Sequence, residues 1–129
     1  MTKVIQSATL VLPQSGVGSE TITDALVHYS IALLTSGLGE KTIDVIATAP
    51  PVPGATNLLV WLEVSSYSAT GGFALVGSPI VIVNNPPGSF RYRAIAWTME
   101  SRWARLAVQY PIPVAGFPWV VQAAFEART

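Results

Sequence analysis

Apolar and polar side chains alternate along much of the chain. The alternation is regular over residues 27–33, where every second side chain is a large apolar one, and again over residues 43–47. A period of two predicts strands with one buried face. Residues 20–34 also fit a helical stripe, but their valine, tyrosine and isoleucine favour a strand, which we expect there.

Clusters of proline and glycine, such as APPVPGATN and NNPPGS, divide the chain into short segments. Between them the pattern predicts further strands at about residues 3–12, 57–65, 72–76, 79–84, 89–98, 102–110 and 118–127. About eight or nine short strands predict an all-β fold, a single antiparallel β-sandwich of jelly-roll type with little or no helix. We expect one domain over residues 1–129, with residues 1–19 as an extended arm and a Gly-rich loop.

The segment FRYRAIAWTMESRWARL, residues 90–106, holds four of the five arginines of the chain. We expect a hairpin here, with residues 89–98 and 102–110 as strands and TMES as the turn. Alternation along both strands then predicts one outward surface formed by Arg91, Arg93, Trp97, Trp103 and Arg105. The predicted inward set includes Ile43, Val45, Leu58, Val60, Leu62, Tyr92, Leu106, Val108 and Val121.

Several roles fit this arginine-rich surface. Arginine stems can lie over tryptophan rings and cover apolar area while their charged groups stay in water. Tryptophan and arginine are also favoured anchors of protein interfaces, and these five residues are our candidate protein interface. Single-stranded nucleic acid or a stacked sugar are further alternatives. Glu63, in the apolar segment NLLVWLEVSSYS, is a candidate counter-ion for one of the arginines.

Composition favours a non-enzymatic protein that assembles with itself. Half of the residues are hydrophobic and only 11% are charged, so we expect a homo-oligomer, most simply a trimer. The net charge of zero argues against nucleic acid or an anionic membrane as a partner. Residues 1–63 carry five carboxylates against two lysines, and residues 64–129 carry five arginines against two glutamates. This asymmetry suits a contact between the halves or between copies.

Catalytic and cofactor motifs are missing from the sequence. His28 is the single histidine, which excludes a histidine metal cluster, and its alternating setting indicates a structural role. Phosphate-binding loops and a nucleophile elbow do not occur either. We therefore expect no enzyme activity, no cofactor and no metal, although a loop carboxylate could hold calcium. The N-terminal residues lack the pattern of a signal peptide.

The succession LLVWLEVSS, PIVIV, PGSFRYRAIAW, SRWARLAV and WVVQAAFEA, over residues 57–127, resembles the small β-sandwich proteins of tailed-phage virions, in particular capsid decoration proteins. The resemblance implies a structural virion protein, made in the host cytoplasm. As a trimer on the capsid surface, it would stabilise the head by bridging neighbouring major capsid subunits. Carbohydrate-binding sandwiches share much of this pattern, so a carbohydrate-binding or adhesive module of a phage tail or cell surface is the alternative.

Overall fold

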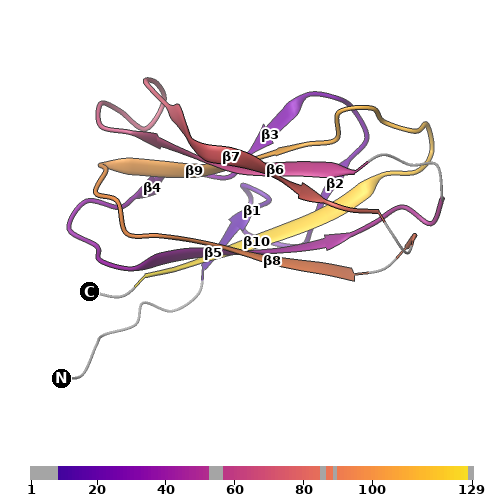
Figure 1. Cartoon of the computed structure of the whole chain (residues 1–129), viewed down its shortest axis with the longest axis horizontal. Helices are drawn as coiled ribbons and strands as arrows, with labels where there is room; N and C mark the ends of the chain where they lie inside the picture. Colours follow the sequence, from indigo (N-terminus) through magenta and orange to yellow (C-terminus); the bar gives the residue numbers. More distant parts are fainter. Residues whose placement is uncertain (1–8, 53–56, 85–86, 89, 128–129) are drawn as a thin grey trace.

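The computed structural model describes residues 9–52, 57–84, 87–88 and 90–127. Within this part of the chain all regular elements are strands, which form two antiparallel sheets packed face to face (Figure 1). The expected all-β sandwich is therefore confirmed. The described residues contain no helix that could cross a membrane.

Each sheet contains five strands. Sheet I has the order β1-β10-β5-β8, and β2 also pairs with β10. Its strands are β1 (Thr9–Leu12), β2 (Glu20–Ile22), β5 (Lys41–Thr48), β8 (Phe90–Trp97) and β10 (Trp119–Ala127). Sheet II has the order β3-β9-β6-β7, and β4 also pairs with β9. Its strands are β3 (Val27–Tyr29), β4 (Leu33–Leu34), β6 (Leu58–Ser65), β7 (Ala74–Ile82) and β9 (Trp103–Gln109).

The strand boundaries differ from the expectation at three places. Residues 20–34 form three short strands divided between the two sheets, since Asp24 and Ser30 interrupt the alternation with turns and side-chain hydrogen bonds. The two strands expected at 72–76 and 79–84 are one strand, β7, which passes through a register shift near Gly77, where φ is +72°. In the predicted strand 3–12, residues 3–8 lie outside the described part of the chain.

The core between the sheets consists of the alternate residues of both inner faces. Eight of the nine predicted inward residues are buried, in each case with less than a twentieth of the residue exposed: Ile43, Val45, Leu58, Val60, Leu62, Leu106, Val108 and Val121. Tyr92 is the exception, because 65% of it is exposed. The expectation for Tyr92 is wrong because the inward face of β8 is the opposite one.

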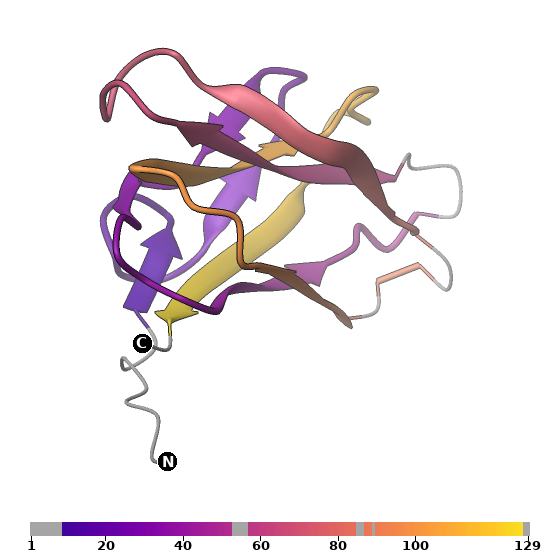
Figure 2. The ribbon, with the colours of Figure 1, turned by 60° about the vertical axis from the view of Figure 1, so that its left-hand side comes forward.

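The predicted hairpin of residues 89–110 does not form. β8 pairs with β5 in sheet I, whereas β9 pairs with β3, β4 and β6 in sheet II. The segment between them crosses from one layer to the other, as the orange connection in Figure 2 shows. Because β8 is an edge strand, the arginines on its core-facing side can reach solvent past the edge. Arginine was therefore a misleading marker of the outer face of β8.

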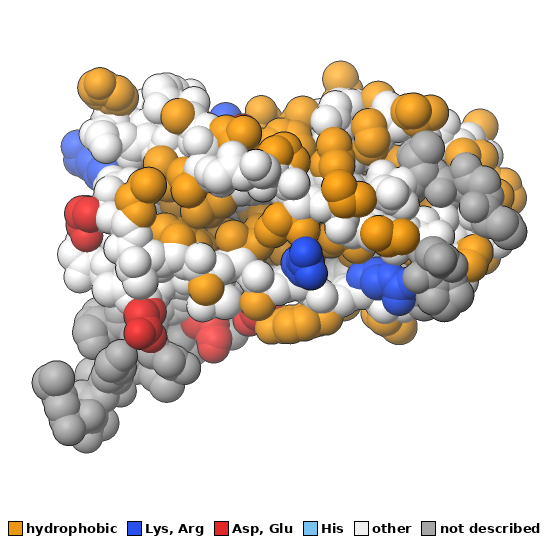
Figure 3. Space-filling view, in the orientation of Figure 1, with side chains coloured by type: hydrophobic (Ala, Val, Ile, Leu, Met, Phe, Trp, Pro, Cys, Tyr) orange, Lys and Arg blue, Asp and Glu red, His pale blue; other side chains and the backbone are white. Residues whose placement is uncertain are grey.

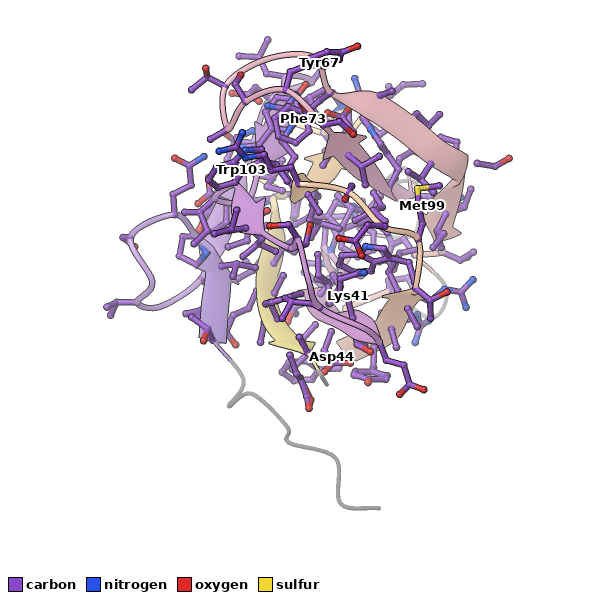
Figure 4. All side chains as sticks on the ribbon, turned by 90° about the vertical axis from the view of Figure 1, so that its left-hand side faces the viewer. Lys41, Asp44, Tyr67, Phe73, Met99 and Trp103 are labelled. Atoms are coloured by element: carbon purple, nitrogen blue, oxygen red, sulfur yellow. The ribbon has the colours of Figure 1, made fainter. Side chains whose placement is uncertain are left out.

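A buried lysine closes one end of the sandwich. Lys41 is fully buried, and its Nζ donates hydrogen bonds to the carbonyl oxygens of Leu38 (3.3 Å) and Met99 (3.0 Å). The ammonium also lies 5.9 Å from the centre of the Trp97 ring. In Figure 4, Lys41 lies between the layers, whereas Asp44 points out of sheet I. Lys41 therefore ties the β4–β5 and β8–β9 connections together.

Candidate functional site

The outer face of sheet II carries an arginine held between two aromatic rings. The guanidinium carbon of Arg105, on β9, lies 3.8 Å from the centre of the Tyr29 ring and 4.1 Å from the centre of the Phe73 ring. Tyr29 belongs to β3, which lies on one side of β9, and Phe73 immediately precedes β7, which lies on the other side beyond β6. The two rings therefore reach Arg105 on the same face from opposite edges of sheet II. Cation–π contact on both sides fixes the orientation of the guanidinium.

Strand register supplies the counter-ion of this arginine. Glu63 on β6 lies directly opposite Arg105, and its Oε1 accepts hydrogen bonds from Arg105 Nε (2.9 Å) and Nη2 (2.8 Å). The other carboxylate oxygen accepts a hydrogen bond from the Trp61 indole nitrogen at 2.8 Å. The expectation that Glu63 pairs with an arginine is thus confirmed. The resulting cluster, which we call the stacked platform, consists of Tyr29, Trp61, Glu63, Phe73 and Arg105.

A groove runs past the Tyr29 side of the stacked platform. One depression of about 440 Å³ lies between Tyr29 and Arg105 on one side and the loop residues Ala69 and Thr70 on the other. A second depression of about 470 Å³ is lined by Tyr29, Glu20 and His28, among others. Gln14 and Tyr29 line both depressions, so the two are neighbours along one surface, which we call the Tyr29 groove.

The loop between β6 and β7, on one side of the groove, has a defined shape. Ser65 Oγ donates a hydrogen bond to the Gly71 carbonyl oxygen (2.7 Å) and accepts one from the Tyr67 amide (3.1 Å). Gly72 has a φ of +73°, and a Cβ there would lie only 2.7 Å from the Tyr67 ring. Figure 4 shows Tyr67 at the tip of this loop and Phe73 below it. The loop therefore holds Phe73 against the guanidinium.

His28 links the two sheets at the other end of the groove. Its Nδ1 lies 3.2 Å from Glu20 Oε1, on β2 of sheet I, and its Nε2 lies 2.9 Å from Asp24 Oδ1. The hydrogen bond with His28 lowers the pKa of the Asp24 carboxyl below its ordinary value. The contacts agree with the structural role expected for His28. Within the described residues, no group of three or more histidine, cysteine, aspartate or glutamate side chains is arranged so that it could hold a metal ion.

The five predicted interface residues do not share one surface. Trp103 and Arg105 lie on sheet II, whereas Arg91, Arg93 and Trp97 lie on β8 of sheet I. Trp97 is 8% exposed and packs against Phe125, with ring centres 6.1 Å apart, so its predicted outward position is wrong. Trp97 lies inward because the core-facing side of β8 is the opposite of the predicted one. A contact of the other four residues with another chain stays a prediction.

Sequence reasoning missed most of the groove and of the stacked platform. Tyr29 and Phe73 come from distant segments that meet at Arg105 only because β3 and β7 lie on opposite sides of β9 and β6, and Gln14 comes from a third segment. Two local signals were available. Trp61 and Glu63 are two residues apart on one strand, so their side chains share a face, and the glycine pair before Phe73 marks a tight loop.

The outer face of sheet I is a second apolar surface, without such a network. Phe90 is 74% exposed, and Tyr92 and Ile46 are also exposed on the same face, together with Ala94. The Tyr92 hydroxyl donates a hydrogen bond to the Asp44 carboxylate, which raises the pKa of Tyr92 above its ordinary value. The residues of this face alternate regularly along three long paired strands, β10, β5 and β8.

Comparison with known proteins identifies the fold. No family model matches the chain, and no curated protein matches it either. Many solved structures are similar to it, and three of them match nearly its whole length. The CBM22-1–GH10 modules of Clostridium thermocellum xylanase 10B, in complex with xylohexaose, match 98% of the chain at 10% identity with a TM-score of 0.54. The chain spans about a quarter (26%) of that structure.

The other two similar structures are separate modules. The CBM22-1 xylan-binding domain of Paenibacillus barcinonensis Xyn10C matches 98% of the chain and 85% of its own length, at 9% identity with a TM-score of 0.50. The K1 cleaved adhesin domain of Porphyromonas gingivalis Lys-gingipain matches 95% of the chain and 72% of its own length, at 17% identity with a TM-score of 0.52. At these identities the similarity shows a shared β-sandwich fold.

Proposed function

We propose that the chain is a non-catalytic carbohydrate-binding module and that the Tyr29 groove is its binding site. The observation that carries the proposal is the composition of the groove. Its lining includes the aromatic ring of Tyr29, the amide of Gln14, the carboxylate of Glu20 and the hydroxyl of Ser15. Aromatic rings stack on the apolar faces of sugars, and the surrounding polar groups can bind the hydroxyls. A few placed polar groups on an apolar surface are typical of ligand sites.

The stacked platform supports the same proposal because it is pre-organised. Arg105 and Glu63 neutralise each other, and their side chains are only 22% and 13% exposed. Tyr29 is therefore held in place by a guanidinium whose own position is fixed by two hydrogen bonds to Glu63. Rigid binding groups lose little conformational entropy when a ligand binds. Two of the similar structures, described as a complex with xylohexaose and as a xylan-binding domain, lend further support.

Binding to a panel of neutral polysaccharides, measured by affinity electrophoresis and then by calorimetry on oligosaccharides, tests the proposal. The panel includes xylan and xylohexaose. We expect Tyr29→Ala to weaken binding at least about tenfold, which corresponds to ~1.4 kcal/mol. Phe90→Ala is the matched control, since it removes an exposed ring from the opposite sheet, and it is expected to leave affinity unchanged. No binding across the panel, or equal loss in both variants, contradicts the proposal.

The outer face of sheet I favours a second candidate, the capsid decoration protein that the sequence resembles. We propose for this case a homo-oligomer, made in the host cytoplasm, that bridges major capsid subunits on the virion. Its support is the exposed apolar set of Phe90, Tyr92 and Ile46, which suits a protein contact. Adjacent capsid genes, and co-sedimentation of the protein with the capsids they encode, are the expected results. Loss of co-sedimentation in Phe90→Ala, with Tyr29→Ala unaffected, would separate this function from sugar binding.

A further inference from the structure

The edges of the two sheets differ in how they are protected. Sheet I ends on one side at β1 and β2, which are four and three residues long, and sheet II ends at β3 and β4, which are three and two residues long. The opposite edge of sheet II is β7, whose register is broken and which contains Gly77 and Pro79. Short strands, bulges and proline are common protections against unwanted edge pairing.

β8, the remaining edge of sheet I, lacks these protections. Its eight residues, FRYRAIAW, pair with β5 in unbroken register from Phe90 to Trp97 and include neither glycine nor proline. No described strand pairs with the other side of β8. Half of its backbone hydrogen-bonding groups therefore face outward along one edge, which is a template for another strand.

Inward arginines are one recognised protection of an edge, but they cover only half of β8. Arg91 donates hydrogen bonds to the carbonyl oxygens of Val83 and Phe90, which holds it at the mouth between the sheets. A depression of about 210 Å³ lies there, between residues 81–83 and 91–93. The half of the strand from Ala94 to Trp97 carries no charge. Figure 3 shows a hydrophobic hollow between the two layers on this side of the molecule.

We propose that the β8 edge pairs with β8 of a second copy of this chain, antiparallel and about a two-fold axis at Ala94. The strand is self-complementary in size. On its outer face the large rings of Phe90 and Tyr92 occupy the first half, and Ala94 and Ala96 occupy the second. An antiparallel pair with this register places Tyr92 across from the partner's Ala96. On both sides of the axis, a large residue of one strand then lies directly opposite a small residue of the other strand.

The positions of the charged side chains favour the same antiparallel register. Arg91 and Arg93 lie in the first half of β8, and its second half, from Ala94 to Trp97, carries no charge. An antiparallel partner therefore brings each arginine half beside the uncharged half of the other copy. An axis at Ala94 also sets Arg93 opposite the partner's Ile95, whereas an axis at Arg93 would set two arginines directly opposite each other, which is unfavourable.

Pairing of this kind is closed. A two-fold contact uses both β8 edges at once, so the two copies form one continuous ten-stranded sheet and leave the short or broken edges outside. A heterologous contact through the same edge would continue into a fibre. The expected species is therefore a dimer.

Sedimentation equilibrium and light scattering over about 1–500 μM protein test the pairing. We expect a mass of twice the chain's 13.7 kDa at high concentration. Ala94→Lys places two ammonium groups at the axis and is expected to weaken the dimer at least about tenfold. Ala74→Lys is the matched control, because Ala74 is an exposed alanine on the other long edge strand, β7, and it should leave the dimer intact. A wild-type monomer at the highest concentration, or a trimer, overturns the proposal.

Hydrogen exchange of the wild-type protein provides a second measurement that does not depend on a variant. As the concentration rises through the dimer transition, about half of the amides of β8 should gain protection, whereas those of β7 should not. A dimer without this protection is formed elsewhere, and it overturns the proposal as surely as a monomer does.

Discussion

The outer faces of the two sheets both expose aromatic side chains, but they hold them in different ways. On sheet II, Tyr29 and Phe73 are fixed against Arg105, whose charge is matched by Glu63. On sheet I, Phe90 and Tyr92 project from an edge strand, and the hydrogen bond of Tyr92 to Asp44 is the tie that the structure gives them. Figure 4 shows the separation, with Phe73 and Trp103 on one layer and Asp44 beneath the other.

The difference suggests two kinds of recognition. A fixed aromatic ring beside polar groups suits a small polar ligand, because its position is set before binding. Exposed rings beside alanines suit another protein surface, against which they become buried in the complex. The sugar site that we propose therefore lies on the outer side of sheet II and the dimer contact at the β8 edge of sheet I, and occupation of one leaves the other accessible.

The largest expected effect tests which side of β8 faces the core. Trp97→Ala removes a buried ring that packs against Phe125, and we expect the free energy of unfolding to fall by about 3–5 kcal/mol. Tyr92→Ala, on the opposite side of the same strand, should cost less than about 1 kcal/mol. Chemical denaturation of both variants at a concentration below dimerisation measures the difference. Equal losses would mean that the two faces of β8 are not distinguished as described.

A smaller effect is expected from the two arginine environments. Arg105→Met leaves the part-buried Glu63 without its cation, and we expect a loss of about 1–3 kcal/mol in the free energy of unfolding. Arg93→Met is the matched control. Arg93 is exposed and makes no hydrogen bond or ion pair within the described residues, so this change should cost less than about 0.5 kcal/mol. A loss of stability in Arg93→Met as large as in Arg105→Met would remove the contrast between the two arginine environments.

Alternation along single strands predicted much of this structure. It identified the long strands, the sandwich and most of the core, because a buried face imposes a period of two whatever the neighbouring strands are. It did not distinguish a hairpin from a crossover after Trp97, since both connections follow the same local pattern. The phase of β8 was then assigned from its arginines, which are compatible with an inward position only at a sheet edge.

The candidate site was harder to predict than the core. The pairing of Glu63 with an arginine was anticipated because Glu63 lies on a largely apolar strand that is expected to be covered on both faces. The Tyr29 groove was not, because it requires the strand order of sheet II and the path of two loops. Strand order depends on packing between distant segments, and a single sequence carries little direct information about it.

The smallest expected effect concerns pH and the one tie that holds Tyr92. The hydrogen bond to Asp44 raises the pKa of the Tyr92 hydroxyl in the folded protein, so folding favours the neutral phenol. The stabilisation from this contact is present below the ordinary tyrosine pKa and is lost as pH rises through the raised folded pKa. Ultraviolet titration of the native protein should show a tyrosine that ionises above the ordinary tyrosine pKa, and this step should be missing in Tyr92→Phe. If Tyr92→Phe instead removes a step at the ordinary tyrosine pKa, the hydroxyl does not hold the ring, and sheet I presents its aromatic side chains without any polar tie.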